Sequence, residues 1–128
     1  MPGRSRDPLV RALVSALDAK RVQVGDGARR LYSRDASVIR GGQAGVICFP
    51  ETTEEVSACV VAALAHGRDF VARGAGTGLA GGAVPCDEPV MVVLTRMDRI
   101  LEVDVPRRLA WVEPGVVNLD LSRHLAGT

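Results

Sequence analysis

The sequence predicts an α+β fold in which a small parallel β-α-β unit is followed by an antiparallel hairpin. Short apolar runs at 46–49 and 70–73 are typical of buried strands. They flank a segment, 53–66, with the three- and four-residue apolar spacing of a helix. A strand, a helix and a strand in this order favour parallel strands joined by a right-handed crossover. The later segment 100–112 alternates, turns and returns, which indicates the hairpin.

The first predicted element is a helix at 8–19. Asp7 can cap it, and Pro8 suits the first helical position. Its apolar residues recur at helical spacing: Leu9, Val10, Leu13, Val14 and Leu17. The segment 21–45 carries five glycines among charged residues, and we expect it to be mostly loop.

The β-α-β unit has clear boundary signals. Pro50 ends the strand at 46–49, and Thr52 and Glu55 then have the spacing of a capping box. Gly67 follows the helix as its expected C-terminal stop. These signals fix the unit between residues 46 and 73.

Three further elements are expected after residue 89. The continuous apolar run at 90–94 predicts a third buried strand. Strands at 100–105 and 109–112 form the hairpin around a turn that begins at Pro106. Asn118 is then expected to cap a short helix.

Composition excludes several classes of protein. The chain has 128 residues, with 16 Lys and Arg against 15 Asp and Glu. The resulting net charge of +1 argues against binding to nucleic acid, which needs a basic face. Apolar residues make up 47 % of the chain, which excludes disorder for most of it. Because no stretch approaches ~20 uninterrupted apolar residues, no transmembrane segment is expected.

The N-terminus is basic but lacks the cleavage site of a secretory signal. The three cysteines, Cys48, Cys59 and Cys86, contain no Cys-x-x-Cys pair, so we expect reduced thiols in a cytoplasmic protein. A zinc site built from Cys59 and His66 would need two further ligands, and nothing in the spacing recommends them.

The segment from Arg73 to Gly82 is the candidate site. It follows a predicted strand directly and holds five glycines in the nine residues from Gly74. Such a loop can turn successive backbone amides toward one anion, and Thr77 can add a hydroxyl while Arg73 supplies a nearby cation. Phosphate or pyrophosphate is the partner that this chemistry favours. A flexible surface loop is the alternative that composition alone leaves open.

Two common phosphate motifs do not fit this loop. Gly76-x-Gly78-x-x-Gly81 matches the dinucleotide fingerprint, and Asp98 follows at a suitable distance for a ribose carboxylate. That fingerprint must open a long helix, and the glycines and prolines before the strand at 90 leave no room for one. Asp98 is therefore interpreted as a turn residue. A Walker loop is excluded because no Lys-Ser or Lys-Thr follows the glycines.

Five blocks of the sequence, in this order, carry a family resemblance. They are Tyr32-Ser33-Arg34-Asp35-Ala36-Ser37; Phe49-Pro50-Glu51-Thr52-Thr53-Glu54-Glu55-Val56; the loop from Arg73 to Gly82; Met97-Asp98-Arg99-Ile100-Leu101-Glu102-Val103-Asp104; and Val112-Glu113-Pro114-Gly115-Val116. Together they resemble the N-terminal half of the FAD-binding domain of the vanillyl-alcohol oxidase / p-cresol methylhydroxylase (PCMH-type) superfamily. The group that they resemble most comprises the glycolate oxidase FAD subunit and D-lactate dehydrogenase.

The resemblance implies noncovalent FAD between two α+β subdomains, and a loop that holds the FAD pyrophosphate by backbone amides. The domain plan would be an N-terminal helix and linker at 1–30, a first FAD-binding subdomain at 31–97 and the start of a second at 98–128. The implied cofactor-binding residues are Pro50, Arg73, Gly74, Ala75, Gly76, Thr77, Gly78, Leu79, Gly82, Pro114 and Gly115. On this pattern Pro50 lies near the adenine.

In similar proteins a second flavin-binding segment and a C-terminal cap follow, and the cap binds the 2-hydroxy acid. Neither is present in this chain, so we expect a fragment or a truncated or split reading frame, with an exposed apolar surface at the hairpin. No catalytic residue is transferred. His66 and His124 are interpreted as surface or capping residues, and covalent flavin attachment at Cys86 is not expected.

The implied function is the FAD-binding portion of an oxidoreductase that converts a 2-hydroxy acid of the glycolate or D-lactate type to a 2-oxo acid. An iron–sulfur or other redox subunit is an expected partner and could hold the protein at the inner membrane. Two alternatives stay open. The chain could be an inactive remnant with weak or no FAD binding, or part of a flavoenzyme that oxidises another alcohol.

Overall fold

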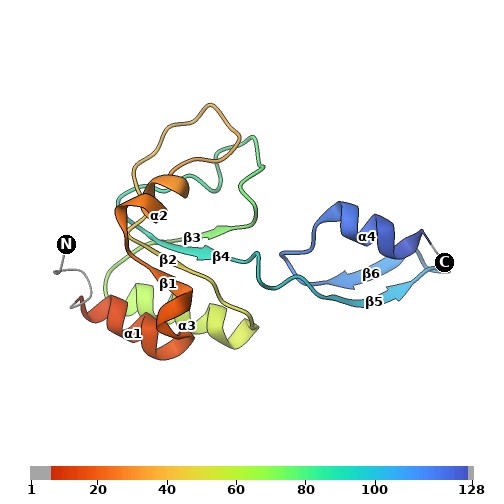
Figure 1. Ribbon diagram of the computed structural model, residues 1–128, viewed down its shortest axis with the longest axis horizontal. Helices are drawn as coiled ribbons and strands as arrows, with labels where there is room; N and C mark the ends of the chain where they lie inside the picture. The colour runs from red at the N-terminus through yellow and green to blue at the C-terminus, as the bar shows by residue number, and fades with distance from the viewer. Residues whose placement is uncertain (1–6, 127–128) are drawn as a thin grey trace.

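A four-stranded sheet forms the centre of the larger of two lobes in the computed structural model, which describes residues 7–126 (Figure 1). Its strands lie in the order β1 (Val22–Gln23), β2 (Val46–Cys48), β4 (Val90–Val93) and β3 (Phe70–Arg73). β2 and β3 both run parallel to β4, which lies between them, and β1 is antiparallel to β2. The predicted parallel strands are confirmed. β4 is inserted between the two strands of the β-α-β unit.

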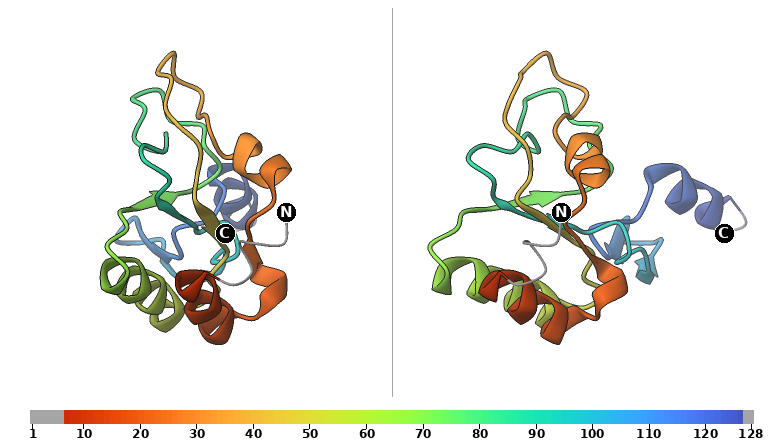
Figure 2. Two further views of the ribbon diagram at one scale, coloured as in Figure 1. Left: turned by 90° about the vertical axis from the view of Figure 1, so that its left-hand side faces the viewer. Right: turned by 60° about the vertical axis from the view of Figure 1, so that its left-hand side comes forward.

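Helices cover both faces of this sheet. α1 (Pro8–Leu17) and α3 (Thr53–Ala65) pack against each other on one face, and α2 (Asp26–Leu31) lies on the other (Figure 2). Because both faces of β2 and β4 are covered, these strands are continuously apolar and every one of their residues is buried. Toward α1 and α3 the buried strand residues are Val46, Cys48, Val90 and Val92, and toward α2 they are Ile47, Met91 and Val93.

The predicted helix starts are confirmed by the caps, whereas α1 ends at Leu17, two residues before its predicted end. The Asp7 carboxylate accepts a hydrogen bond from the Leu9 amide at 2.9 Å, and the Thr52 hydroxyl accepts one from the Glu55 amide at 3.2 Å. The Glu55 carboxylate accepts from the amide of Glu51 at 2.7 Å, one residue before the cap. Gly67 has a φ of +63° after α3, as its role as a stop requires.

The segment 21–45 is mostly irregular, as expected, but three short elements occupy part of residues 21–31. They are the end of a 3₁₀ turn (η2, Ala19–Arg21), β1 and α2. Tertiary contacts form these short elements. The Arg29 side chain is buried and donates from Nε to the carbonyl of Ala44 at 2.5 Å, while its Nη2 pairs with Glu88. Sequence periodicity does not reveal these elements, because β1 has only two residues and the short helix α2 contains Gly27.

The smaller lobe consists of the hairpin and one helix. β5 (Ile100–Asp104) and β6 (Leu109–Val112) pair antiparallel, as predicted, with an irregularity between Ile100 and Glu102. α4 (Asn118–Leu125) follows. The expectation that Asn118 caps this helix is wrong. Val117 holds the cap position, because its carbonyl already accepts from the amides of Asp120 and Leu121.

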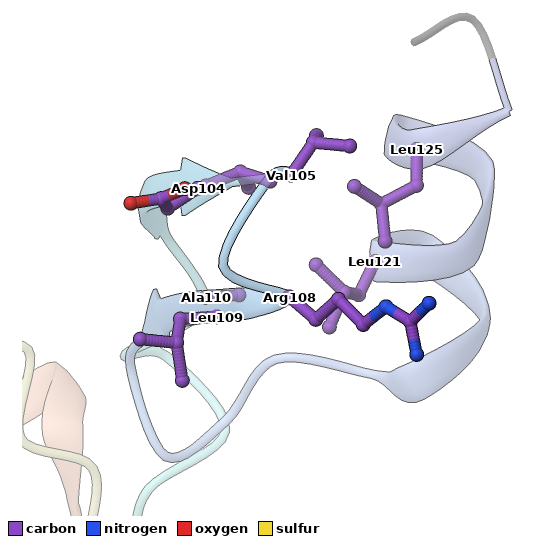
Figure 3. A pocket seen from close by; sticks show the side chains of 8 residues that line it. Asp104, Val105, Arg108, Leu109, Ala110, Leu121 and Leu125 are labelled. Carbon is purple, nitrogen blue, oxygen red and sulfur yellow. The ribbon is translucent and has the colours of Figure 1, made fainter.

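The predicted exposed apolar surface is confirmed on this smaller lobe. Leu101 and Trp111 each expose more than half of their surface. Beside the hairpin turn, Leu121 and Leu125 point from α4 toward the strand ends and border a groove of about 500 Å³ (Figure 3). The other residues that line this groove are Val103, Asp104, Val105, Arg108, Leu109 and Ala110. Within residues 7–126, no helix combines the length and apolar character that a bilayer span requires.

Candidate functional site

The glycine loop leaves β3 and forms bends and turns from Gly74 to Gly82. Gly76 and Gly81 have φ values of +76° and +78°, which side-chain-bearing residues rarely adopt. At Gly74, Gly78 and Gly82 an added β-carbon would meet no heavy atom within 4 Å. The loop therefore exposes backbone at these three positions, as an anion-binding loop requires.

Arg73 lies beneath this loop. It is only 8 % exposed, and its Nη1 donates to the carbonyl of Arg34 at 2.8 Å and to that of Ala83 at 3.3 Å. The guanidinium carbon lies 5.3 Å from the centre of the Tyr32 ring, which is a cation–π contact. A β-carbon on Gly76 would overlap the guanidinium, so the loop backbone packs directly on it.

A cleft of about 510 Å³ joins the loop to the smaller lobe. On one side it is lined by Gly74, Ala75 and Thr77, and on the other by Pro114 and Gly115. The structure thus brings five of the predicted cofactor-binding residues together across one cleft. The remaining lining residues are Thr95, Asp98, Ile100, Val116, Val117, Asn118 and Asp120, and sequence reasoning missed their contribution.

Close backbone packing positions the second side of the cleft. The amide of Gly115 donates to the carbonyl of Met97 at 2.8 Å, and the amide of Glu113 donates to that of Arg99 at 2.9 Å. The Glu113 carboxylate accepts from Arg99 Nη2 at 2.7 Å and from the Arg99 amide at 2.9 Å, and these bonds lower its pKa. The segment that links the lobes before β5 and the segment that follows β6 are therefore tied together beside the cleft.

The other predicted residues lie outside the lining of this cleft. Pro50 is fully buried in the larger lobe. Leu79 is 79 % exposed, and it is not among the residues that line the cleft. Gly76 packs on Arg73, and Gly78 and Gly82 face open space.

The cleft presents donors on one side and carboxylates on the other. Backbone amides of the loop and the Thr77 hydroxyl suit an anion. Asp98 and Asp120 are acceptors that suit sugar hydroxyls. Among the described residues that line the cleft there is no His, Cys, Lys or Arg, so the ionisable side chains of this lining are the carboxylates of Asp98 and Asp120.

The histidines and cysteines considered from the sequence lie elsewhere. His66 is exposed at the end of α3, where its Nδ1 lies 2.8 Å from the carbonyl oxygen of Ala62. Cys48 and Cys59 are buried together in the core, and the hydrogen bond between their thiols together with burial raises the pKa of Cys48. Cys86 is exposed and does not line the cleft.

The cleft residues that were missed could not be found by spacing. Thr95 and Asp98 come before the hairpin, whereas Asn118 and Asp120 come after it. They meet because the hairpin reverses the chain, and the sequence carries no signal of where the returning segment lies. The prediction that Asp98 is a turn residue is wrong: the turn lies at 95–96, and Asp98 lines the cleft from the irregular segment before β5.

Comparisons with known proteins agree with this geometry. Over 98 residues the chain is 33 % identical to the glycolate oxidase subunit GlcD of Bacillus subtilis, covering 77 % of this chain and 21 % of that protein. It is 33 % identical over 107 residues to the probable mitochondrial D-lactate dehydrogenase of Danio rerio, covering 84 % and 22 %. The chain thus spans about a fifth of the length of these relatives.

The fold recurs in a solved structure. The crystal structure of p-cresol methylhydroxylase with substrate bound superposes with a TM-score of 0.81 at 21 % identity, covering 93 % of this chain and 24 % of that one. Residues 44–128, two thirds of the sequence, match the family described as the FAD binding domain. The chain therefore belongs to the FAD binding domain family, in the PCMH-type fold, and FAD is the cofactor of that family.

Proposed function

We propose that the cleft between the glycine loop and the 114–120 segment is the part of the FAD site that this chain supplies. The pyrophosphate binds noncovalently to the loop amides from Gly74 to Gly78, with the Thr77 hydroxyl as a further donor. Pro114 and Gly115 contact the cofactor from the smaller lobe. The observation that carries this proposal is the juxtaposition of Gly74, Ala75 and Thr77 with Pro114 and Gly115 around one cleft.

The chemistry of the lining supports this orientation. Uncovered glycine backbone allows a phosphate to approach the amides closely. Asp98 and Asp120 would repel a phosphate but accept hydrogen bonds from hydroxyls, so the ribityl or ribose portion lies on their side. Pro50, which is buried, shapes the adenine end from within the fold and does not contact the ring.

The full-length function that we propose is the oxidation of a 2-hydroxy acid of the glycolate or D-lactate type to its 2-oxo acid. The similarity to a glycolate oxidase subunit and to a probable D-lactate dehydrogenase supports this substrate class. FAD supplies the redox chemistry when bound, and this chain's residues bind and orient it. The same proposal includes a substrate cap and an iron–sulfur or other redox subunit. It also includes a cytoplasmic location, with peripheral attachment to the membrane through that subunit.

Titration of FAD with the purified chain, followed by flavin fluorescence, tests the assignment of the loop. Gly76→Val introduces a branched side chain at a positive φ, against the Arg73 guanidinium, and we expect it to abolish binding. Gly27→Val, in α2 where an added β-carbon meets nothing within 4 Å, is the matched control and should bind as the parent does. Equal binding by Gly76→Val and the parent would refute the assignment.

A further inference from the structure

Arg73 carries a buried charge that the protein compensates only in part. Its hydrogen bonds go to two neutral carbonyls, of Arg34 and Ala83, and its Nε is buried without a hydrogen-bond partner. The Asp35 carboxylate interacts electrostatically with Arg73; its Oδ1 accepts from the Ser37 amide at 2.8 Å, and its Oδ2 is buried without a hydrogen-bond partner. Within residues 7–126 no ion pair links Asp35 to Arg73. Such a cation attracts an anion strongly, because the surrounding dielectric is low.

The same side chain ties two other segments of the chain to the end of β3. Through Arg34 it holds the loop that follows α2, through Ala83 it holds the far end of the glycine loop, and its face stacks on Tyr32. Tyr32 in turn packs edge-on against Phe49, with ring centres 5.8 Å apart. The guanidinium is therefore fixed from several sides, directly beneath Gly76.

From this arrangement we propose that Arg73 is a positioning residue. It holds the conformation of the glycine loop and places a positive charge next to the Gly76 backbone, without touching the cofactor. The absence of a side chain at Gly76 lets the backbone lie on the guanidinium, so the positive charge lies one backbone layer away from the exposed face. This role rests on the proposed function for its ligand, the FAD pyrophosphate. It would supply positive charge to a proposed anion site that has no Lys or Arg among its described lining residues.

Three variants separate this role from ordinary stabilisation. Arg73→Met removes the charge and the hydrogen bonds but keeps an unbranched chain. Arg73→Lys keeps the charge and loses the planar fork. Arg29→Met is the matched control, because Arg29 is also buried but its Nη2 pairs with Glu88. Each variant is titrated with FAD at low and high salt. Backbone order parameters of 74–78 are measured by ¹⁵N relaxation without FAD.

We expect Arg73→Met to raise the FAD dissociation constant roughly tenfold and to flatten its salt dependence, since one buried charge is lost. Its loop order parameters should fall from about 0.85 toward 0.6. Arg73→Lys should restore the salt dependence of FAD binding. If Arg73→Met does not fold, Arg73→Lys is compared with the parent in its place. Arg29→Met should lower the melting temperature and leave both FAD binding and the loop unchanged.

Two results overturn the inference while leaving the FAD site intact. One is parental binding and loop order in Arg73→Met, and the other is an equal loss of affinity in Arg29→Met. If the parent chain binds no FAD, the proposed function of the chain fails, and the order parameters decide the positioning role by themselves. Loop order in Arg73→Met equal to that of the parent then refutes it.

Discussion

The amide of Gly115 donates to the carbonyl oxygen of Met97 at 2.8 Å, and this bond joins the segment after β6 to the segment that links the two lobes. It holds Pro114 and Gly115 opposite the glycine loop across the cleft. An added β-carbon at Gly115 would overlap the carbonyl oxygen of Leu94 and lie 2.8 Å from that of Met97. Both contacts are with backbone, which cannot move aside as the end of a flexible side chain can.

Gly115→Ala should therefore destabilise the joint between the lobes. We expect a loss of about 1–3 kcal/mol in the free energy of unfolding, the usual range for overpacking. Gly74→Ala is the control, because its β-carbon would meet nothing within 4 Å. Urea unfolding followed by Trp111 fluorescence measures both variants. Equal midpoints for Gly115→Ala and the parent would contradict the packing described at this joint.

The ion pair between Arg21 and Glu55 predicts a pH dependence of stability. Arg21 donates from Nη1 and Nη2 to the two carboxylate oxygens at 2.5 and 2.6 Å, and this lowers the pKa of Glu55. Because the folded pKa lies below the unfolded value of about 4.3, the stabilisation is complete above that value. It is lost as the pH falls through the folded pKa.

Glu55→Gln should remove that part of the pH dependence. At neutral pH we expect a loss of about 1–2 kcal/mol, the range for a hydrogen bond to a charged group in a partly exposed site. The variant and the parent should converge as the pH falls from the unfolded value of about 4.3 through the lower folded pKa. Glu54→Gln, exposed in the same first turn, is the control. Thermal melts between pH 2.5 and 7 measure the effect, and a constant difference across that range would contradict this account.

The exposed hairpin predicts self-association. Trp111 on β6 exposes 52 % of its surface, and a two-stranded sheet has two free edges. Trp111→Lys should raise the dissociation constant for self-association by about tenfold, which corresponds to ~1.4 kcal/mol. Val61→Lys is the control, because Val61 is 62 % exposed on α3, away from the hairpin. Sedimentation velocity measures both, and an equal effect of Val61→Lys would show that the hairpin is not the contact.

The sequence was most informative where a covered element has a regular pattern. The strands at 46–48 and 90–93 are apolar throughout because helices bury both of their faces, so their sequence identifies them without reference to the rest of the fold. Asp7 and Thr52 mark helix starts by a local hydrogen bond, which sequence neighbours alone determine. Such features depend on few residues and are therefore predictable.

The features that sequence reasoning missed depend on contacts between distant segments. α2 contains Gly27, and the buried Arg29 holds it by reaching Ala44 and Glu88. Arg73 could be expected to lie near the glycine loop, but its place beneath the loop depends on carbonyls that lie 39 and 10 residues away. The second side of the cleft depends in the same way on how the hairpin returns the chain.

Chemical-shift mapping with FAD tests the central claim most directly. A ¹H–¹⁵N spectrum of the chain, recorded during FAD addition, reports every backbone amide except those of proline. The account predicts that Gly74, Thr77, Gly115 and Asn118 shift together, on both sides of the cleft. Shifts confined to the groove at Leu109, Leu121 and Leu125, or no shifts at saturating FAD, would contradict it.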